Sequence, residues 1–469
     1  MDALGASSIV WFRNDLRLED NPAFFHAVKN GPVIPIFLWS PNEEDSSVGS
    51  ASKIWLYHSL FTLKKQLESI GLNLIVRKGD LLKNLLEIAE SSNAKSVYSN
   101  IRYEPSSIKK DQDIARKIRD IGLEYKTFNG NLIIDPSEIL NKSNLPFKVF
   151  SHFWKKCLSV AAPTKPLAVP KKIISINKKI QSLEIKDLNL GETKYWALKI
   201  SKYWDFNYRF AQGKLDSFIL NNFNKYSENR NFPSIDGTSK LSPYLHYGQI
   251  SPNQIFYSLS KSKNTNWKES QYLAEIGWRE FGYYLMFHFP HTINEPLRKE
   301  FKNFPWIEND ILFESWKNGT TGYPLVDAGM RELWETGWMH NRVRMVVASF
   351  LVKHLLIDWR KGADWFFDTL VDADLASNTL GWQWSAGCGA DSAPYFRIFN
   401  PTTQAEKFDV NGDYIRRWIP EIKNLRTPNI FQPHKFKDDL FLSNSYSAPI
   451  VDHSESRKKA LLAYEIIKK

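Results

Sequence analysis

The sequence has only two cysteines, Cys157 and Cys388, among its 469 residues. Two cysteines exclude a framework of several disulfides and a cysteine-based metal site, and they are typical of a reducing, intracellular compartment. The first residues lack a basic region followed by an apolar segment, and no apolar run approaches the ~18 residues that a membrane span requires. We therefore expect a soluble, cytoplasmic protein without a membrane partner.

Several common catalytic signatures are also missing. The sequence has no HExxH pair, no clustered histidines and no GxSxG turn, so it predicts neither a metal site nor a nucleophile-elbow hydrolase. The turn after the first apolar run reads RNDLRLEDN, and it lacks the glycines that a dinucleotide loop needs. The missing glycines exclude a nicotinamide site in the N-terminal region.

Positive charge and tryptophan are what the chain does have. Its formal net charge is +11, which favours a polyanionic partner such as nucleic acid but equally fits a basic surface without a specific partner. Ten of the 17 tryptophans fall between residues 267 and 384. The aromatic side chains are therefore concentrated in one part of the chain.

The pattern of apolar residues divides the chain into three parts. Residues 1–131 alternate short apolar runs such as SIVWF with amphipathic stretches, which predicts an α/β domain with a doubly wound, Rossmann-like parallel sheet. Residues 132–203 contain three closely spaced prolines and many lysines, so we expect an irregular connector. Residues 204–469 have helical periodicity, which predicts a large all-helical domain able to enclose a cofactor.

Two stretches in the helical region carry candidate chemistry. GTSKLS at 237–242 combines small and hydroxyl residues with Lys240 ahead of a helix, a pattern that cradles phosphate or simply caps the helix. EIGWREF at 275–281 places Glu275, Trp278 and Arg279 along one side of a helix. Such a side chain set suits a nucleobase, although an ordinary Glu275–Arg279 ion pair explains it as well.

Two further stretches carry polar side chains on helix faces. NRVRM places Asn341, Arg344 and Met345 together, which fits either a binding surface or ordinary packing. In DADLASNTLGW, Asp374 and Asn378 lie one turn apart, in a stripe that runs into a tryptophan. Because buried polar groups need partners, this stripe predicts a helix lining a polar heteroaromatic ring.

The segment LGWQW at 380–384 contains two tryptophans separated by one glutamine. On a helix, residues two apart point roughly 200° from each other. We therefore expect Trp382 and Trp384 to serve different surfaces, one inside the protein and the other facing a cavity.

Taken together and in order, these motifs resemble the photolyase/cryptochrome family of blue-light flavoproteins. The resemblance runs from VWFRNDLRLEDNPA at 10–23 through DGTSKLSPYLHYGQISP at 236–252 to GWQWSAGCGADSAPYFRIFNP at 381–401, and it is nearest to bacterial photolyases of class I or III. It implies an N-terminal antenna domain and a helical domain that holds FAD. It also implies that reduced, light-excited FAD transfers an electron to a cyclobutane pyrimidine dimer in DNA and splits it.

The resemblance assigns roles to particular residues. FAD contacts are implied for Tyr226, Thr238, Ser239, Leu241, Ser242 and Arg279, joined by Lys240 of the phosphate cradle, and for Arg344, Asp372, Asp374 and Asn378 around the flavin ring. An electron-transfer chain is implied for Trp382, Trp359 and Trp306. The dimer is expected to contact Glu275, Trp278, Asn341, Met345 and Trp384, and DNA phosphates to contact Arg342 and Arg397.

The expected partner is UV-damaged DNA, bound by a monomer. A second antenna chromophore, a folate (5,10-methenyltetrahydrofolate) or a deazaflavin, is left open. A photolyase for 6-4 lesions needs a histidine pair, and His340 has no partner histidine nearby in the sequence. A plant-type cryptochrome sensor has aspartate where Asn378 stands, and a DASH-type enzyme for single strands fits the lesion residues less well. A basic nucleic-acid-binding protein without a cofactor leaves the polar stripe unexplained.

Overall fold

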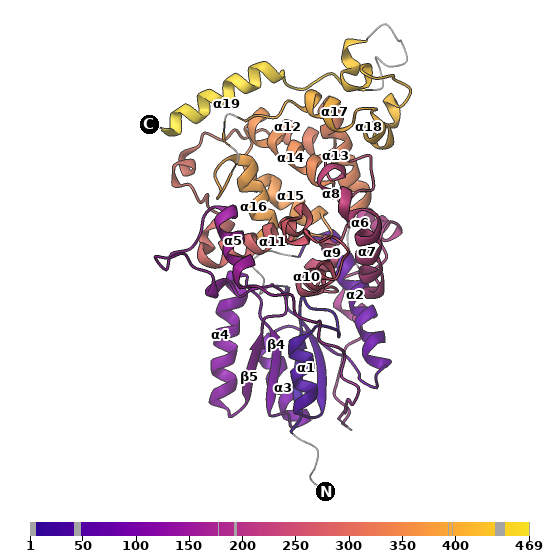
Figure 1. The fold of residues 1–469 in the computed structure, drawn as a ribbon, viewed down its shortest axis with the longest axis vertical. Coiled ribbons are helices and arrows are strands. Elements are labelled where there is room, and N and C mark those ends of the chain that lie inside the picture. The colour runs from indigo at the N-terminus through magenta and orange to yellow at the C-terminus, as the bar shows by residue number, and fades with distance from the viewer. Residues whose placement is uncertain are drawn as a thin grey trace. The chain divides into compact units, whose positions relative to one another are not determined.

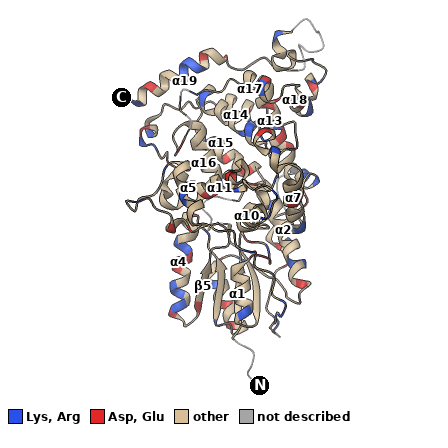
Figure 2. Ribbon diagram, in the orientation of Figure 1, with Lys and Arg blue, Asp and Glu red and all other residues tan. Residues whose placement is uncertain are grey.

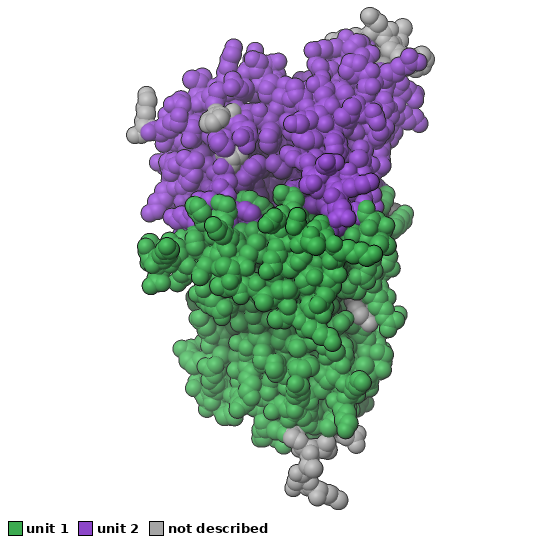
Figure 3. All heavy atoms as spheres, viewed as in Figure 1, with its two compact units in different colours: residues 1–147, 151–221, 239–288 green, residues 148–150, 222–238, 289–469 purple. Residues whose placement is uncertain are grey.

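The computed structural model describes residues 6–41, 48–176, 178–191, 195–392, 394–395, 397–436 and 446–468, without the side chains of residues 195 and 208. The chain forms two compact units (Figure 3). Unit 1 comprises residues 1–147, 151–221 and 239–288, and unit 2 comprises residues 148–150, 222–238 and 289–469. The predicted boundaries at residues 131 and 203 stay a prediction, and the compact units group the chain differently.

Unit 1 is built on a five-stranded parallel sheet with the strand order β3-β2-β1-β4-β5 (Figure 1). The strands are β1 (Ser8–Phe12), β2 (Val33–Trp39), β3 (Ile75–Lys78), β4 (Ser96–Asn100) and β5 (Glu124–Phe128). The helices between them are α1 (Pro22–Asn30), α2 (Ser50–Glu68), α3 (Leu81–Ser92) and α4 (Pro105–Asp120). Every residue of β1, β2 and β4 is buried, as in sheets whose two faces are both covered. The predicted α/β fold class is confirmed.

Local sequence signals explain where the helices of this sheet begin. The Asn21 side chain accepts a hydrogen bond of 3.1 Å from Phe24 N, and Pro22 occupies the first turn of α1. Asp80 caps α3 in the same way through Lys83 N. These caps satisfy backbone N–H groups that have no partner inside the helix.

The expected connector is more ordered than its prolines indicate. It contains α5 (Phe150–Val160), η3 (Ile185–Leu188), α6 (Tyr195–Leu198) and η4 (Lys199–Lys202). The segment after α5 is held by the sheet, because Val33 N donates to Ile174 O and Leu183 N donates to Val76 O. The helix α5 forms because FSHFWKKCLSV is amphipathic and buries one side.

The remainder of unit 1 is helical. Its helices are α7 (Tyr208–Asn221), α9 (Ser242–His246), α10 (Pro252–Ser260) and α11 (Gln271–His288). Gly277 of α11 lies against the Trp154 ring of α5, where an added Cβ would stand 2.6 Å from the ring.

Unit 2 is helical, with a hydrophobic core shared by most of its elements. Its helices are α8 (Tyr226–Asn229), α12 (Asp310–Lys317), α13 (Pro324–Thr336), α14 (Asn341–Ser349), the π-helical turn η9 (Phe350–His354), α15 (Trp359–Thr369), α16 (Leu375–Ala386), α17 (Pro401–Phe408), α18 (Asp413–Trp418) and α19 (His453–Lys468). Within the described residues, no helix is both long and apolar enough to cross a bilayer.

We expect Gly277→Ala to destabilise the protein by about 1–3 kcal/mol, because the new methyl group overlaps the Trp154 ring in a packed region. Gly213→Ala is the matched control, since a Cβ at this position of α7 meets nothing within 4 Å. Alanine there is expected to stabilise the helix by up to about 1 kcal/mol. Denaturant unfolding of both variants measures the difference, and equal effects would contradict this packing.

Candidate functional site

The two tryptophans of the WQW segment lie on different sides of α16. Trp382 is 2% exposed and contacts the rings of Phe366 and Trp316, with centroid distances of 5.0 and 6.1 Å. Trp384 is only half-buried. Gly362 of α15 allows Trp382 to pack closely, because a Cβ there would stand 2.2 Å from the indole. Trp382 is therefore the more buried of the two, as expected, whereas the cavity expected beside Trp384 stays a prediction.

Gln383, between the two tryptophans, is a residue that the sequence analysis missed. It is 2% exposed, and its side-chain amide donates to Thr292 O at 2.7 Å and to Glu295 O at 2.9 Å. Its Oε1 accepts from Leu297 N at 3.0 Å. These three bonds fix the rotation of α16, and the only sequence signal is an amide flanked by large apolar residues.

Arg344 of α14 and Asp372 form the ion pair that the resemblance implies. Arg344 Nη2 lies 2.9 and 3.1 Å from the two carboxylate oxygens, and Arg344 Nε donates to Met339 O at 2.7 Å. The Asp372 side chain is 4% exposed. The guanidinium therefore holds this buried carboxylate in a fixed position.

The polar stripe of α16 finds its partners mainly on the backbone. Asp374 caps the helix by accepting from Ser377 N at 2.8 Å. One turn later, Asn378 Nδ2 donates to Ala363 O at 3.0 Å. Because a carbonyl oxygen only accepts, this contact identifies the amide nitrogen and leaves Asn378 Oδ1 as an acceptor.

The expected electron-transfer tryptophans differ in burial. Trp382 and Trp359 are each 2% exposed and belong to the core of unit 2. Trp306 is partly buried and packs against that core, with its ring centroid 4.3 Å from that of Phe304. The three therefore range from the interior of unit 2 toward its surface.

Of the residues expected to hold the FAD phosphates, Tyr226 and Thr238 belong to unit 2, and residues 239–242 belong to unit 1. Tyr226, in unit 2, is buried, and the Arg230 guanidinium lies 5.6 Å from its ring centroid. In unit 1, Ser239 shares a hydrogen bond of 3.0 Å with Tyr272 OH, and burial raises the pKa of Tyr272. Lys240 has φ +50°, a conformation that is uncommon for residues other than glycine and concentrates at functional sites.

The remaining cradle residues surround this turn. Thr238 is half-buried, Leu241 is buried, and Ser242 begins the short helix α9 with an exposed side chain. Tyr272 was missed by the sequence analysis because its partner Ser239 lies far away in the sequence.

Two of the predicted side chains of α11 form hydrogen bonds within unit 1. Glu275 accepts from Gln271 Nε2 at 2.7 Å. Arg279 donates to Asn131 O at 2.9 Å and lies 3.4 Å from Glu280, which the sequence analysis missed. Burial raises the pKa of Glu280 to about 7, although Arg279 opposes this shift. The Trp278 side chain is half-buried beside Phe281 (5.9 Å).

The proposed lesion residues of unit 2 begin at the start of α14. Asn341 is exposed, and Met345 is half-buried with its sulfur 3.9 Å from Arg342 Nη1. The Arg342 guanidinium donates to Asn231 Oδ1 and lies 4.4 Å from the Phe408 ring centroid. Arg342 is thus partly engaged within the protein.

Arg397 is the second expected phosphate contact. Its side chain is exposed, and its carbonyl oxygen accepts from Lys353 Nζ at 3.0 Å. Figure 2 shows Lys and Arg on many elements of the chain, α4 and α19 among them. Positive charge is therefore distributed along the sequence, as its composition indicates.

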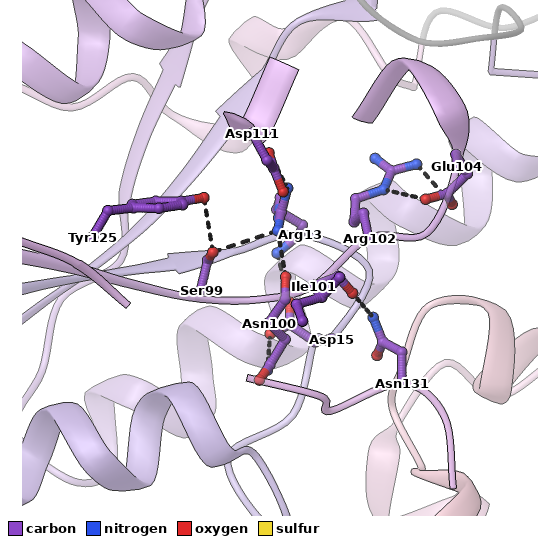
Figure 4. Close-up of polar contacts among 10 residues, drawn as sticks. All are labelled: Arg13, Asp15, Ser99, Asn100, Ile101, Arg102, Glu104, Asp111, Tyr125 and Asn131. Carbon is purple, nitrogen blue, oxygen red and sulfur yellow. Dashed lines mark hydrogen bonds and ion pairs between the residues drawn. The ribbon is translucent and has the colours of Figure 1, made fainter. Parts of the chain in front are cut away.

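The carboxyl ends of β1 and β4 are where a doubly wound sheet of this order changes direction and commonly binds a ligand. There, Arg13 Nη1 lies 2.8 Å from both Asp111 oxygens, and Asn100 Nδ2 donates to Asp15 at 2.6 Å (Figure 4). The charged residues of the RNDLRLEDN turn thus hold neighbouring elements together. The identity of a second chromophore stays open.

Comparison with known proteins identifies the family of this chain. Residues 8–171 match the DNA photolyase family, and residues 272–466 match the FAD binding domain of DNA photolyase. A deoxyribodipyrimidine photo-lyase of Agrobacterium fabrum is 43% identical, over 99% of this chain and 98% of its own. Cryptochrome-1 of Arabidopsis thaliana is 39% identical, over 97% of this chain and 70% of its own.

Solved structures agree with these relatives. The crystal structure of a bacterial class III photolyase from Agrobacterium tumefaciens has a TM-score of 0.95 at 42% identity, covering 100% of this chain and 99% of that one. An archaeal photolyase from Sulfolobus tokodaii with two FAD molecules has a TM-score of 0.82 at 29% identity, covering 98% and 100%. The chain described here belongs to the photolyase/cryptochrome family.

Proposed function

We propose that this chain is a deoxyribodipyrimidine photo-lyase that uses light and reduced FAD to split cyclobutane pyrimidine dimers in DNA. The arrangement of α16 carries this proposal. Its polar stripe lies beside the Arg344–Asp372 ion pair, while Trp382 faces the core and Trp384 does not. The identity of 43% to a photo-lyase over nearly the whole chain supports the same function.

The residues present fit FAD. Asp372 and Asp374 supply two buried carboxylates, one paired with Arg344 and one capping α16. A flavin ring offers N–H and C=O groups that match carboxylate, guanidinium and amide side chains. Arg344, Asp372, Asp374 and Asn378 would hold the ring, and Tyr226, the residues 238–242 and Arg279 would hold the phosphates and ribose.

Bound FAD supplies the electron chemistry: in its fully reduced form it becomes, on absorbing light, a donor of one electron that is recovered when the dimer has split. The protein positions the DNA. Glu275 and Asn341 would form hydrogen bonds with the flipped-out dimer, and Trp278, Met345 and Trp384 would pack against its apolar surface. Arg342 and Arg397 would neutralise DNA phosphates.

A blue-light-sensing cryptochrome is the second candidate function, favoured by the identity of 39% to Cryptochrome-1. Asn378 separates the two functions, because an amide cannot give up a proton to the flavin as a carboxylic acid can. A DASH-type enzyme with a preference for single strands is the third candidate function.

The Sulfolobus tokodaii structure, which contains two FAD molecules, supports a second, light-harvesting chromophore.

We also propose that the enzyme acts as a cytoplasmic monomer. Both of its cysteines are buried and free, which fits a reducing compartment.

The proposed function predicts different defects for the two tryptophans of the WQW segment. In Trp382→Phe, light-driven reduction of oxidised flavin should slow strongly, whereas chemically reduced protein should still repair dimers. Trp384→Ala should photoreduce normally but lose roughly 1–3 kcal/mol of binding to the dimer, because a stacking surface is removed. Flavin absorbance under blue light and dark binding to a dimer-containing duplex measure these effects. Identical defects in both variants would contradict the assigned roles.

A second prediction concerns the amide of Asn378. In Asn378→Asp, the carboxyl faces Ala363 O and needs its proton to donate, so its pKa should rise above the unfolded value of about 3.9. The variant should then resemble the wild type at about pH 4. It should lose about 1.4 kcal/mol for each unit of that rise as the pH increases through the folded pKa.

The measurement is the difference in unfolding free energy between variant and wild type at several pH values. Asn378→Ala is the control, because it removes the same hydrogen bond without adding a titrating group. A pH-independent loss in Asn378→Asp would show that the carboxyl is already ionised.

A further inference from the structure

Lys353 is a buried cation to which the proposed repair reaction gives no role. It lies in the π-helical turn η9, and the residue is 1% exposed. Its Nζ donates to Arg397 O at 3.0 Å and lies 5.2 Å from the centroid of the Tyr395 ring. Among the residues that the structure describes, no carboxylate forms an ion pair with it.

An unpaired buried ammonium is costly. Taking such a charge out of water costs several kcal/mol even after the protein relaxes. A methionine of similar length would fill the same space without this cost. Single π-helical turns also occur frequently at functional sites.

The two contacts described for the Lys353 ammonium are with residues of the segment that carries Arg397. Arg397 N donates to Pro394 O at 2.8 Å. Tyr395, in the same segment, is 1% exposed and stacks on Tyr464 at 4.5 Å. The segment is thus held from inside by Tyr395 and Lys353, while the Arg397 side chain is exposed.

We propose that Lys353 is a positioning residue for DNA binding: its ammonium holds the Arg397 carbonyl and thereby directs the Arg397 guanidinium toward a DNA phosphate. This inference rests on the proposed function, because it takes Arg397 as a phosphate contact. Lys353 itself is buried and does not touch the DNA.

A rise in pH removes the charge of Lys353 without changing the charges of its neighbours. Burial and, after it, the Arg397 charge lower the pKa of Lys353 to about 8, against a small opposing effect of Cys388. Burial lowers the pKa of His354 to about 3 and raises that of Cys388 to about 12.

Other titratable groups described on this side are Tyr395, Tyr323 and, on α19, His453 and Tyr464. Burial raises the pKa of Tyr395 and lowers that of His453. Lys353 is therefore the group among these described residues whose charge is present at about pH 7 and largely lost at about pH 9.

The test compares dark binding of three variants to a duplex oligonucleotide with one thymine dimer, at several salt concentrations. Lys353→Met and Arg397→Ala should each weaken binding and lower the slope of log K against log salt by about 0.9, the value for one phosphate contact. The double variant should bind no more weakly than Arg397→Ala alone. Lys459→Met removes an exposed charge on α19 and should leave the affinity nearly unchanged.

The pH dependence gives a readout that a structural defect would not produce. Wild-type affinity should fall between about pH 7 and about pH 9, as Lys353 loses its charge. The affinity of Arg397→Ala should change much less over this range. If Lys353→Met does not fold, this comparison still decides the proposal.

The outcomes distinguish a failure of the proposed role of Lys353 from a failure of the proposed function. If Arg397→Ala weakens binding but Lys353→Met does not, Lys353 has no positioning role and the proposed function stands. If Arg397→Ala changes neither affinity nor salt slope, the phosphate contact is wrong and the inference falls with it. Light-dependent repair by the wild-type protein then tests the proposed function separately.

Discussion

The anchoring of α16 is the constraint on which the proposed site depends. Asp374 caps the first turn of the helix, and Gln383 near its other end forms three hydrogen bonds with the backbone of residues 292–297. A rotation of the helix would leave these buried groups without partners, at about 1–3 kcal/mol for each group. Since both ends are fixed, Trp382 and Trp384 are held on their respective sides.

The polar side chains inside unit 2 likewise have partners within the protein. Arg344 and Asp372 form an ion pair, and Asn378 donates to Ala363 O. Their positions are therefore set by the fold before FAD or DNA is bound. A site organised in advance loses less conformational freedom on binding, which favours affinity and a defined geometry.

The sequence predicts the fold class and the faces of the main helices, because apolar periodicity records which side of an element is buried. Helix geometry predicts the division between Trp382 and Trp384, because residues two apart on a helix point in different directions. The Arg344–Asp372 pair came only from the family resemblance, since spacing does not identify partners 28 residues apart.

Apolar periodicity does not predict several other features. Gln383 and Lys353 bond mainly to backbone carbonyls and N–H groups far away in the sequence, and no pattern of residue types marks such partners. The helix α5 was hidden by prolines that follow it rather than interrupt it. The grouping of residues 239–288 with the sheet of unit 1 depends on long-range packing.

The most direct test of the account is repair itself. The purified protein, with its flavin reduced, is mixed with a duplex carrying one thymine dimer, and recovered thymine is measured under blue light and in the dark. The account predicts recovery in the light alone. A protein that binds FAD and the dimer but restores no thymine under light would contradict it and would favour a sensory role.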